Sequence, residues 1–177
     1  MLTEDRKTDG LLLEQSVRVN ASLAAVPTSY GFIDLARERE RTSARLEELQ
    51  ARYRHLEQPA GELSGGNQQK SLIARWLLRE PRILIFDEPT RGIDAGARAE
   101  IHQLLAGLAD SGSAVLLVSS DLRELTTISD RIAVLSKGRL VATFEGPTFD
   151  PAAIMTAAFS SHVTSSASPS PGRADHA

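Results

Sequence analysis

Cysteine is absent from this sequence of 177 residues, and neither sign of charge dominates it. Without cysteine the chain forms no disulfide and has no thiol chemistry, which fits a reducing compartment. Lys and Arg number 20 against 23 Asp and Glu, giving a net charge of −3. A strongly basic nucleic-acid-binding surface is therefore not expected, and we predict no nucleic-acid partner.

Long apolar runs are absent as well. The first ten residues, MLTEDRKTDG, are charged and lack the apolar centre of a secretory signal. No stretch approaches the ~20 apolar residues that a membrane-spanning helix needs. We therefore expect a cytoplasmic protein whose only connection to a membrane is through a partner.

The sequence also lacks the phosphate-binding loop G-x-x-x-x-G-K-[ST]. Gly61 with Gly66, and Gly107 with Gly112, have the glycine spacing of that loop, but neither pair is followed by its lysine. The chain thus offers no nucleotide cradle of this kind.

The chain is long enough for one domain with a subdomain and a tail, because a domain of ~150 residues buries ~70% of its unfolded surface. Residues 11–30 predict a helical region interrupted at Pro27. The stretch 34–58 is dense in charge of both signs, and we expect a solvated helix face with ion pairs at helical spacing, or else a partner-docking face. Apolar residues at helical spacing predict the buried face of this amphipathic helix: Leu46, Leu49, Tyr53 and Leu56.

Strands and helices alternate in the second half of the sequence. RILIFDEP and SAVLLVSS are apolar runs typical of strands buried on both faces of a parallel sheet. RIAVLSKGRLVATFEG predicts two strands about a Lys137-Gly138 turn. Helices are expected between these strands and on either side of them, at 64–79, 95–112, 121–129 and 152–159. The order predicts an α/β architecture.

Two carboxylates follow the first of these strands, in ILIFDEPT. Ligands of open α/β sheets bind at the carboxyl ends of the strands, which is where Asp87 and Glu88 lie. An aspartate at this position helps to hold Mg²⁺ in P-loop NTPases, and a second carboxylate could orient or deprotonate water. The alternative is that the two acids only begin a turn before Pro89.

A second motif, LSGGNQQK, precedes the first. Ser64 can cap a helix, and the glycines let the backbone approach an anion, which the free N–H groups and the helix dipole favour. The alternative is a capped helix after a turn. Because Asp87 lies 23 residues after Ser64 and RGID follows, we favour the functional interpretation of both motifs.

With these motifs the chain resembles the nucleotide-binding domains of ABC transporters. LSGGNQQK resembles the ABC signature, RILIFDEPT the Walker B strand, and RGID the D-loop, whose aspartate would be Asp94. NQQK, DEPTRGID, TEDRKTDGL and VSSDL resemble one subgroup more narrowly. This is the second nucleotide-binding domain of the tandem ATPases that energise bacterial import of ribose, galactose, xylose and similar sugars. The resemblance runs from about Leu2 to Phe159.

The resemblance implies an incomplete P-loop NTPase domain of ABC type over residues 1–160. It would have a helical subdomain at about 11–62, followed by the signature motif and a parallel-sheet α/β core at 63–160. The Ser/Pro-rich composition of residues 161–177 separately predicts a disordered tail. In the resembled family Walker A lies upstream of TEDRK, so the expected missing piece is the first strand, the P-loop and its helix. Their absence should expose a sheet edge and an apolar helix-docking surface.

The resemblance also implies roles for single residues. ABC domains work as head-to-tail pairs, so the signature would close over ATP held by a partner domain. Asp87 would help to hold Mg²⁺ indirectly, and Glu88 would be the general base. Ser120 takes the position of the switch histidine and Glu4 that of the Q-loop glutamine, whereas His55 and His102 are expected to be surface residues. The remaining cofactor-binding positions are Ser64, Gly65, Gly66, Gln68 and Asp94.

The implied function is the ATP-binding and ATP-hydrolysing subunit of a sugar importer. Its cofactors would be ATP and Mg²⁺. Its partners would be a second ABC domain that supplies Walker A, a membrane permease and, indirectly, a periplasmic sugar-binding protein, which place it at the inner face of the cell membrane. The alternatives are a non-catalytic remnant or binding subunit, and a soluble ABC ATPase acting on DNA or ribosomes. The stretch 34–58 is too short and too balanced in charge for the last of these.

Overall fold

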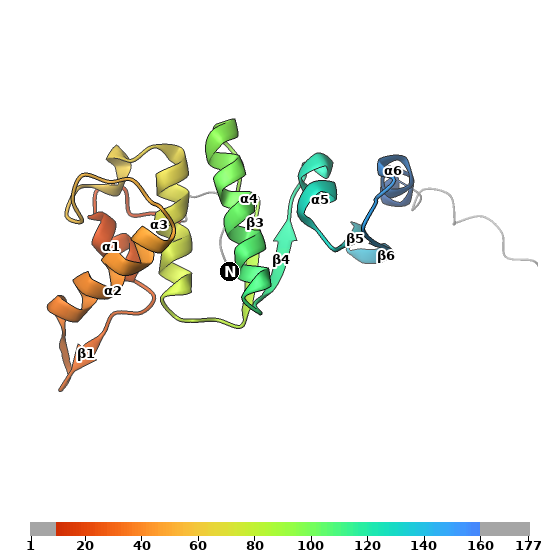
Figure 1. The fold of residues 1–177 in the computed structure, drawn as a ribbon. Helices are drawn as coiled ribbons and strands as arrows, with labels where there is room; N and C mark the ends of the chain where they lie inside the picture. Colours follow the sequence, from red (N-terminus) through yellow and green to blue (C-terminus); the bar gives the residue numbers. More distant parts are fainter. Residues whose placement is uncertain (1–9, 160–177) are drawn as a thin grey trace, which may run out of the picture. The chain divides into compact units, whose positions relative to one another are not determined.

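The computed structural model describes residues 10–159, which fall into two compact units divided between Ser120 and Asp121. The first unit begins with helices α1 (Val17–Ser22) and α2 (Leu35–Glu48) and the longer helix α3 (Gly65–Leu77). Figure 1 shows these three helices side by side, and α3 packs against both of the others. A 3-10 turn, η2 (Ala60–Glu62), precedes α3. The centre of this part is built from fully buried Val17, Leu46 and Ile73.

A small hairpin separates α1 from α2, where the sequence predicted only an interrupted helix. Its strands are β1 (Thr28–Ser29) and β2 (Phe32–Ile33), paired antiparallel. The turn between them places Tyr30 at φ 50° and Gly31 at φ 84°. Tyr30 is an unusual residue for this left-handed backbone, which explains why the turn carries no strong sequence signal.

The prediction that one amphipathic helix continues through Tyr53 and Leu56 was wrong, because α2 ends at Glu48. Gln50 lies at φ 51°, its N–H bonds the carbonyl of Glu47 at 2.8 Å, and the next N–H bonds that of Leu46 at 2.9 Å. These are the two hydrogen bonds of a Schellman cap. Glycine usually occupies the left-handed position of this cap, and glutamine here gives no stop signal.

The charged stretch is also less solvated than expected. Glu38 of α2 is only 4% exposed and accepts from Arg18 Nη1 at 2.6 Å and from the Ser22 hydroxyl at 2.5 Å. Arg18 in addition binds Glu57. One ion pair has the predicted helical spacing, Arg45 with Glu48 on α2. Others join different elements, as Arg18 of α1 does with Glu38 of α2. The charges of this region therefore tie α1 and α2 together.

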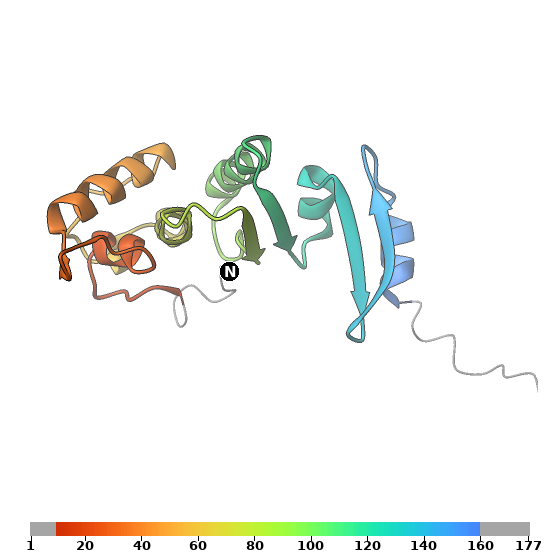
Figure 2. The same ribbon diagram turned by 90° about the horizontal axis from the view of Figure 1, so that it is seen from below.

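The α/β part of the first unit consists of β3 (Ile83–Asp87), α4 (Ala95–Asp110) and β4 (Ala114–Val118). The two strands are parallel, in register from Ile83 opposite Ala114 to Asp87 opposite Val118. Helix α4 packs against β4 and lies on one side of the strand pair in Figure 2.

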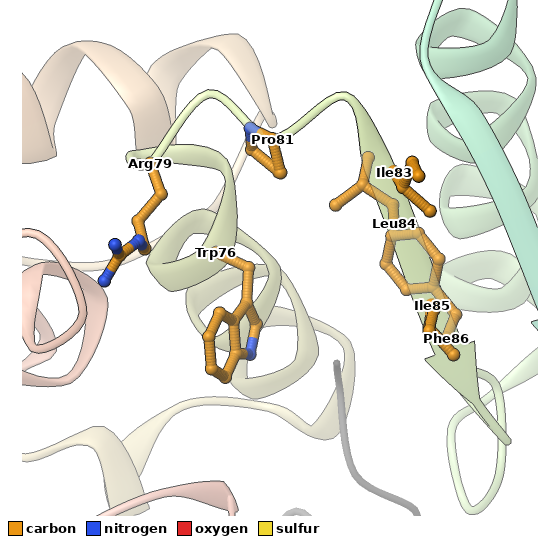
Figure 3. Close-up of a pocket in the computed structure, with 7 residues that line it drawn as sticks. All are labelled: Trp76, Arg79, Pro81, Ile83, Leu84, Ile85 and Phe86. Atoms are coloured by element: carbon orange, nitrogen blue, oxygen red, sulfur yellow. The ribbon is translucent and has the colours of Figure 1, made fainter.

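Burial alternates along these strands, although burial on both faces was predicted. Leu84 and Phe86 are 5% and 2% exposed, whereas Ile83 and Leu116 are 69% and 53% exposed. Within residues 10–159 β3 and β4 pair only with each other, so no further strand covers either edge of the pair. A cavity of about 340 Å³ lies between the end of α3 and β3 (Figure 3). Its lining comprises Trp76, Arg79, Pro81 and the strand residues Ile83, Leu84, Ile85 and Phe86.

The second unit contains α5 (Leu122–Ile128), β5 (Arg131–Ser136), β6 (Arg139–Glu145) and α6 (Pro151–Phe159). Strands β5 and β6 pair antiparallel, and their turn places Lys137 at φ 50° and Gly138 at φ 75°, which confirms the predicted hairpin. Ile132, Val134 and Ile154 form the core between the hairpin and α6.

Candidate functional site

The first group of functional candidates lies at the N-terminus of α3. Ser64 is the N-cap residue, but its hydroxyl accepts no hydrogen bond from a backbone N–H of the helix, contrary to expectation. Instead Ser64 Oγ accepts from Nδ2 of Asn67 at 2.9 Å. The other amide atom, Asn67 Oδ1, accepts from the backbone N–H of Arg52 at 2.7 Å. Asn67 thus connects the serine to the loop that follows α2.

Helix α4 begins next to this point. Asp94 is its N-cap, and its Oδ1 accepts from the N–H of Ala97 at 2.9 Å. This hydrogen bond is the largest cause that lowers the pKa of Asp94 from its ordinary value of 3.8. A Cβ on Gly66 would lie 2.6 Å from the Cβ of Ala97. Glycine at position 66 is therefore what lets the first turns of α3 and α4 approach so closely.

A shallow pocket of about 180 Å³ opens where the two helices begin. It brings together three of the predicted site residues, Ser64, Gly66 and Asp94. Gln68 is not among its lining residues, because its side chain is buried and donates to the carbonyl of Ala60 at 3.4 Å. The other residues that line the pocket are Arg52, Asn67, Gly96, Ala97 and Glu100. We call it the signature pocket.

A buried lysine fixes the walls of the signature pocket. The side chain of Lys70 is 4% exposed, and its Nζ lies 2.7 Å from Oε2 of Glu100 on α4. The same ammonium donates to the carbonyl of Gln50 at 3.0 Å. The hydrogen bond from Lys70, followed by its charge, lowers the pKa of Glu100 from the ordinary value of 4.5. Lys70 therefore joins α3, α4 and the loop after α2.

The second group of candidates lies where β3 and β4 end. Glu88 takes a left-handed backbone at φ 47°, and its N–H bonds the carbonyl of Val118 at 2.9 Å. Its carboxylate Oε1 accepts from the backbone N–H of Ser120 at 2.6 Å. The Glu88 carbonyl accepts from the N–H of Arg91 at 3.1 Å, so the acid also begins a turn. A left-handed backbone is uncommon at a non-glycine residue and occurs at turns and caps as well as at functional sites.

Comparisons with known proteins identify the family of this chain. The ABC transporter family profile matches residues 3–91. The chain belongs to the ABC transporter family. It is 41% identical over 160 residues to the ribose import ATP-binding protein RbsA of Rhodococcus jostii (strain RHA1). It is 45% identical over 157 residues to the ribose import ATP-binding protein RbsA 3 of Rubrobacter xylanophilus. Each match covers 89% of this chain and 32% of the relative, so the chain spans about a third of these curated relatives.

Solved structures show the same family. The dimeric structure of MJ0796, a bacterial ABC transporter cassette, has a TM-score of 0.68 and 26% identity, and the likeness covers 81% of this chain and 62% of that one. A post-hydrolysis state of the same cassette, bound to ADP and Pi, matches with the same TM-score and identity. These likenesses confirm the α/β fold of the P-loop NTPases.

The remaining candidates lie outside the signature pocket or outside the described residues. Asp87 is the last residue of β3 and is half-buried. Glu88 and Ser120, which were expected to be the general base and the switch position, are in contact. Glu4, the expected Q-loop position, lies outside the described residues. His55 is exposed and His102 half-buried. Between residues 10 and 159 no cluster of three His, Cys, Asp or Glu could hold a metal, and no helix is long and apolar enough to cross a membrane.

Sequence reasoning missed four residues of this ABC domain: Arg52, Asn67, Lys70 and Glu100. Asn67 and Lys70 belong to the quoted motif LSGGNQQK, so their motif position could have marked them. Arg52 and Glu100 lie 15 residues before and 30 residues after their partners on α3, and no local pattern joins them.

Acidification should weaken the contact between Lys70 and Glu100. A carboxyl group whose pKa falls on folding stabilises the folded state above its unfolded pKa, and this contribution is lost as the pH falls. Glu100→Gln is therefore expected to be less stable than the parent protein at neutral pH. It should also lose less free energy of unfolding when the pH falls from about 5 to about 3. Urea unfolding at several pH values measures this difference.

Glu40→Gln is the matched control, because Glu40 is an exposed acid of α2 outside the signature pocket. Its pH dependence should follow that of the parent protein. Equal acid sensitivity of Glu100→Gln and the parent would show that the ion pair does not stabilise the fold.

Proposed function

We propose that this chain is part of the ATP-hydrolysing subunit of an ABC importer for sugars. The observation that carries the proposal is the signature pocket, in which the N-termini of α3 and α4 bring Ser64, Gly66 and Asp94 together. Helix N-termini present free N–H groups and a positive dipole end, which favour phosphate. The names of the relatives, ribose import ATP-binding proteins, support the sugar as cargo.

The signature pocket would complete an ATP site whose Walker A loop belongs to a partner domain. Ser64, Gly65 and Gly66 would contact the terminal phosphate of that nucleotide, and Asp94 would line the interface beside it. The cassette MJ0796, to which this chain is similar, was solved as a dimer, which supports a paired arrangement. Gln68 would not contact the nucleotide, but its hydrogen bond to the carbonyl of Ala60 would help to fix the position of α3.

Walker B residues would serve the domain's own nucleotide. Mg²⁺ in nucleotide sites is held by one or two carboxylates together with the phosphates, and the half-buried Asp87 at the end of β3 fits such a limited donor set. The bound ion would neutralise charge on the phosphates. The Glu88 carboxylate would take a proton from the attacking water. The N–H of Ser120 holds Oε1 of this carboxylate at 2.6 Å and so restricts its orientation.

The proposed importer function also implies which proteins the subunit would work with and where in the cell it would lie. ATP binding would close the pair of domains, and the region around residues 11–60 would pass that motion to a membrane permease. The subunit would lie at the inner face of the membrane, and a periplasmic protein would deliver the sugar to the permease.

The 177-residue chain alone is expected to hydrolyse ATP at no more than the background rate. The P-loop backbone and lysine supply most direct contacts to the phosphates in related NTPases, and this sequence contains no such loop. Phosphate release from the purified chain measures the rate. A steady rate that Glu88→Gln abolishes would contradict this expectation.

A hybrid protein tests the proposed function itself. In it this chain replaces the segment that it matches in the Rhodococcus jostii ribose import ATP-binding protein, so that the relative supplies the rest. We expect the hybrid to hydrolyse ATP and to lose turnover when either Glu88 or Gly66 is substituted. A hybrid that depends on Gly66 but not on Glu88 would favour the second candidate, a non-catalytic subunit that lends only its signature pocket. A folded hybrid that depends on neither would reject both.

A further inference from the structure

Arg52 is a cationic residue of the signature pocket that belongs to none of the ABC motifs quoted above. It lies in the loop after α2 and lines the pocket together with residues at the starts of α3 and α4. Its backbone N–H is held by Asn67 Oδ1 at 2.7 Å. Two residues earlier, the carbonyl of Gln50 is held by Lys70. The main chain that carries Arg52 is therefore fixed to α3 at two points.

The same hydrogen bonds determine how Ser64 can act. Because Asn67 Oδ1 accepts from Arg52, the amide must turn its Nδ2 donor toward Ser64, where it lies 2.9 Å from Oγ. Ser64 Oγ accepts this hydrogen bond, so its own hydrogen is available for an acceptor such as a phosphate oxygen. Asn67 thus holds both the hydroxyl of Ser64 and the main chain of Arg52 in place at the signature pocket.

The charges that line the pocket also favour a phosphate-binding role for Arg52. Asp94 and Glu100 both line it, and two carboxylates would repel a phosphate. Lys70 is paired with Glu100, and the Asp94 carboxylate accepts from the backbone N–H of Ala97. Arg52 is close enough to help lower the pKa of Glu100 through its charge. Among the described residues the guanidinium of Arg52 has no hydrogen-bonding or ion-pair partner of its own.

We propose that Arg52 binds the terminal phosphate of the nucleotide that the partner domain holds, beside Ser64 and the backbone N–H groups of the signature. A guanidinium can donate two parallel hydrogen bonds to a phosphate, which suits a pocket whose other donors are a hydroxyl and backbone N–H groups. This inference rests on the proposed function, because it assigns one more residue to the same shared site.

An NMR titration of the full 177-residue chain with inorganic phosphate, and then pyrophosphate, tests Arg52. Ionic strength is held constant so that screening does not change during the titration. We expect the amide signals of Gly65, Gly66 and Asn67 to shift. Arg52→Gln should weaken phosphate binding by about 3- to 10-fold. Arg52→Lys keeps the charge but cannot donate two parallel hydrogen bonds, and it should weaken binding less. Arg37→Gln is the control, because Arg37 is exposed on α2 and does not line the pocket.

The possible results separate this inference from the function on which it rests. If the signature amides shift and Arg52→Gln binds phosphate as tightly as the parent, Arg52 is not a phosphate ligand, whereas the signature remains an anion site. If no signature amide of the folded parent responds, the proposed phosphate role of the whole pocket fails. If Arg37→Gln weakens binding as much as Arg52→Gln, the effect is one of net charge and the assignment of Arg52 is overturned.

Discussion

Replacing Glu88 by glutamine should lower the ATP turnover of the hybrid ATPase by about 10²- to 10⁴-fold, the usual contribution of a positioned general base. The substitution removes the basic carboxylate but keeps an oxygen that can accept from the N–H of Ser120, which lies 2.6 Å from Oε1 in the structure. The backbone bond from Glu88 to Val118 does not depend on the side chain. The loss should therefore appear in kcat, with nucleotide affinity little changed.

Steady-state phosphate release and equilibrium binding of ATP separate these two effects. Glu40→Gln makes the same chemical change on the exposed surface of α2 and should leave both values unaltered. A Glu88→Gln hybrid that turns over within about threefold of the parent would exclude Glu88 as the base, because a general base contributes far more than that. A variant that binds ATP poorly would instead indicate that Glu88 helps to position the nucleotide.

The strand order and the hairpin of the second unit could be predicted from local sequence. The apolar run that ends at Asp87, the helix closed at Gly112, and the Lys137-Gly138 turn each follow from the chemistry of neighbouring residues. The alternating burial of β3 could not be predicted in the same way, and the prediction that both of its faces are buried was wrong. An apolar run shows that a strand can be covered on both faces, but the cover comes from other segments.

Charged residues were the least predictable part of the fold. Lys70, Arg75 and Glu38 are all buried, although lysine, arginine and glutamate usually lie at the protein surface. Arg75 donates to the carbonyls of Gly10 and Asn20, which lie 65 and 55 residues away in the chain. Such partners become neighbours only after folding, so a local reading cannot identify which charges will be satisfied in the interior.

The candidate site also contains some residues whose positions could be predicted from local sequence and others whose positions could not. Asp94 caps α4 through a residue three positions away, so its place followed from local sequence. The motif predicted Ser64 at the start of α3, but the partner of its hydroxyl turned out to be the Asn67 side chain rather than a backbone N–H. Arg52 reaches the same pocket through a contact across 15 residues, and only the folded chain shows it. The site combines a local motif with a loop that tertiary contacts bring to it.

Replacing Gly66 by alanine should reduce the stability of the chain and disable the signature pocket. The added Cβ would lie 2.6 Å from the Cβ of Ala97, an atom fixed to the first turn of α4 rather than the end of a flexible side chain. Helices α3 and α4 would have to move apart, and overpacking of this kind costs about 1–3 kcal/mol. The same movement would separate Ser64 from Asp94 across the pocket. Urea unfolding and the phosphate titration measure the two losses.

Gly107→Ala is the matched control, because it makes the same change inside α4 at a point where, among the described residues, nothing beyond the adjoining helix backbone lies within 4 Å of the new Cβ. It should stabilise the chain by about 0.5–1 kcal/mol through helix propensity, the opposite sign to Gly66→Ala. Removing the opposing methyl group with Ala97→Gly should restore phosphate binding to the Gly66→Ala protein, since the clash would then be gone. If the double variant still fails to bind phosphate, glycine is required at position 66 because the phosphate must approach the backbone closely there. Close packing of the two helices would then be of secondary importance for binding.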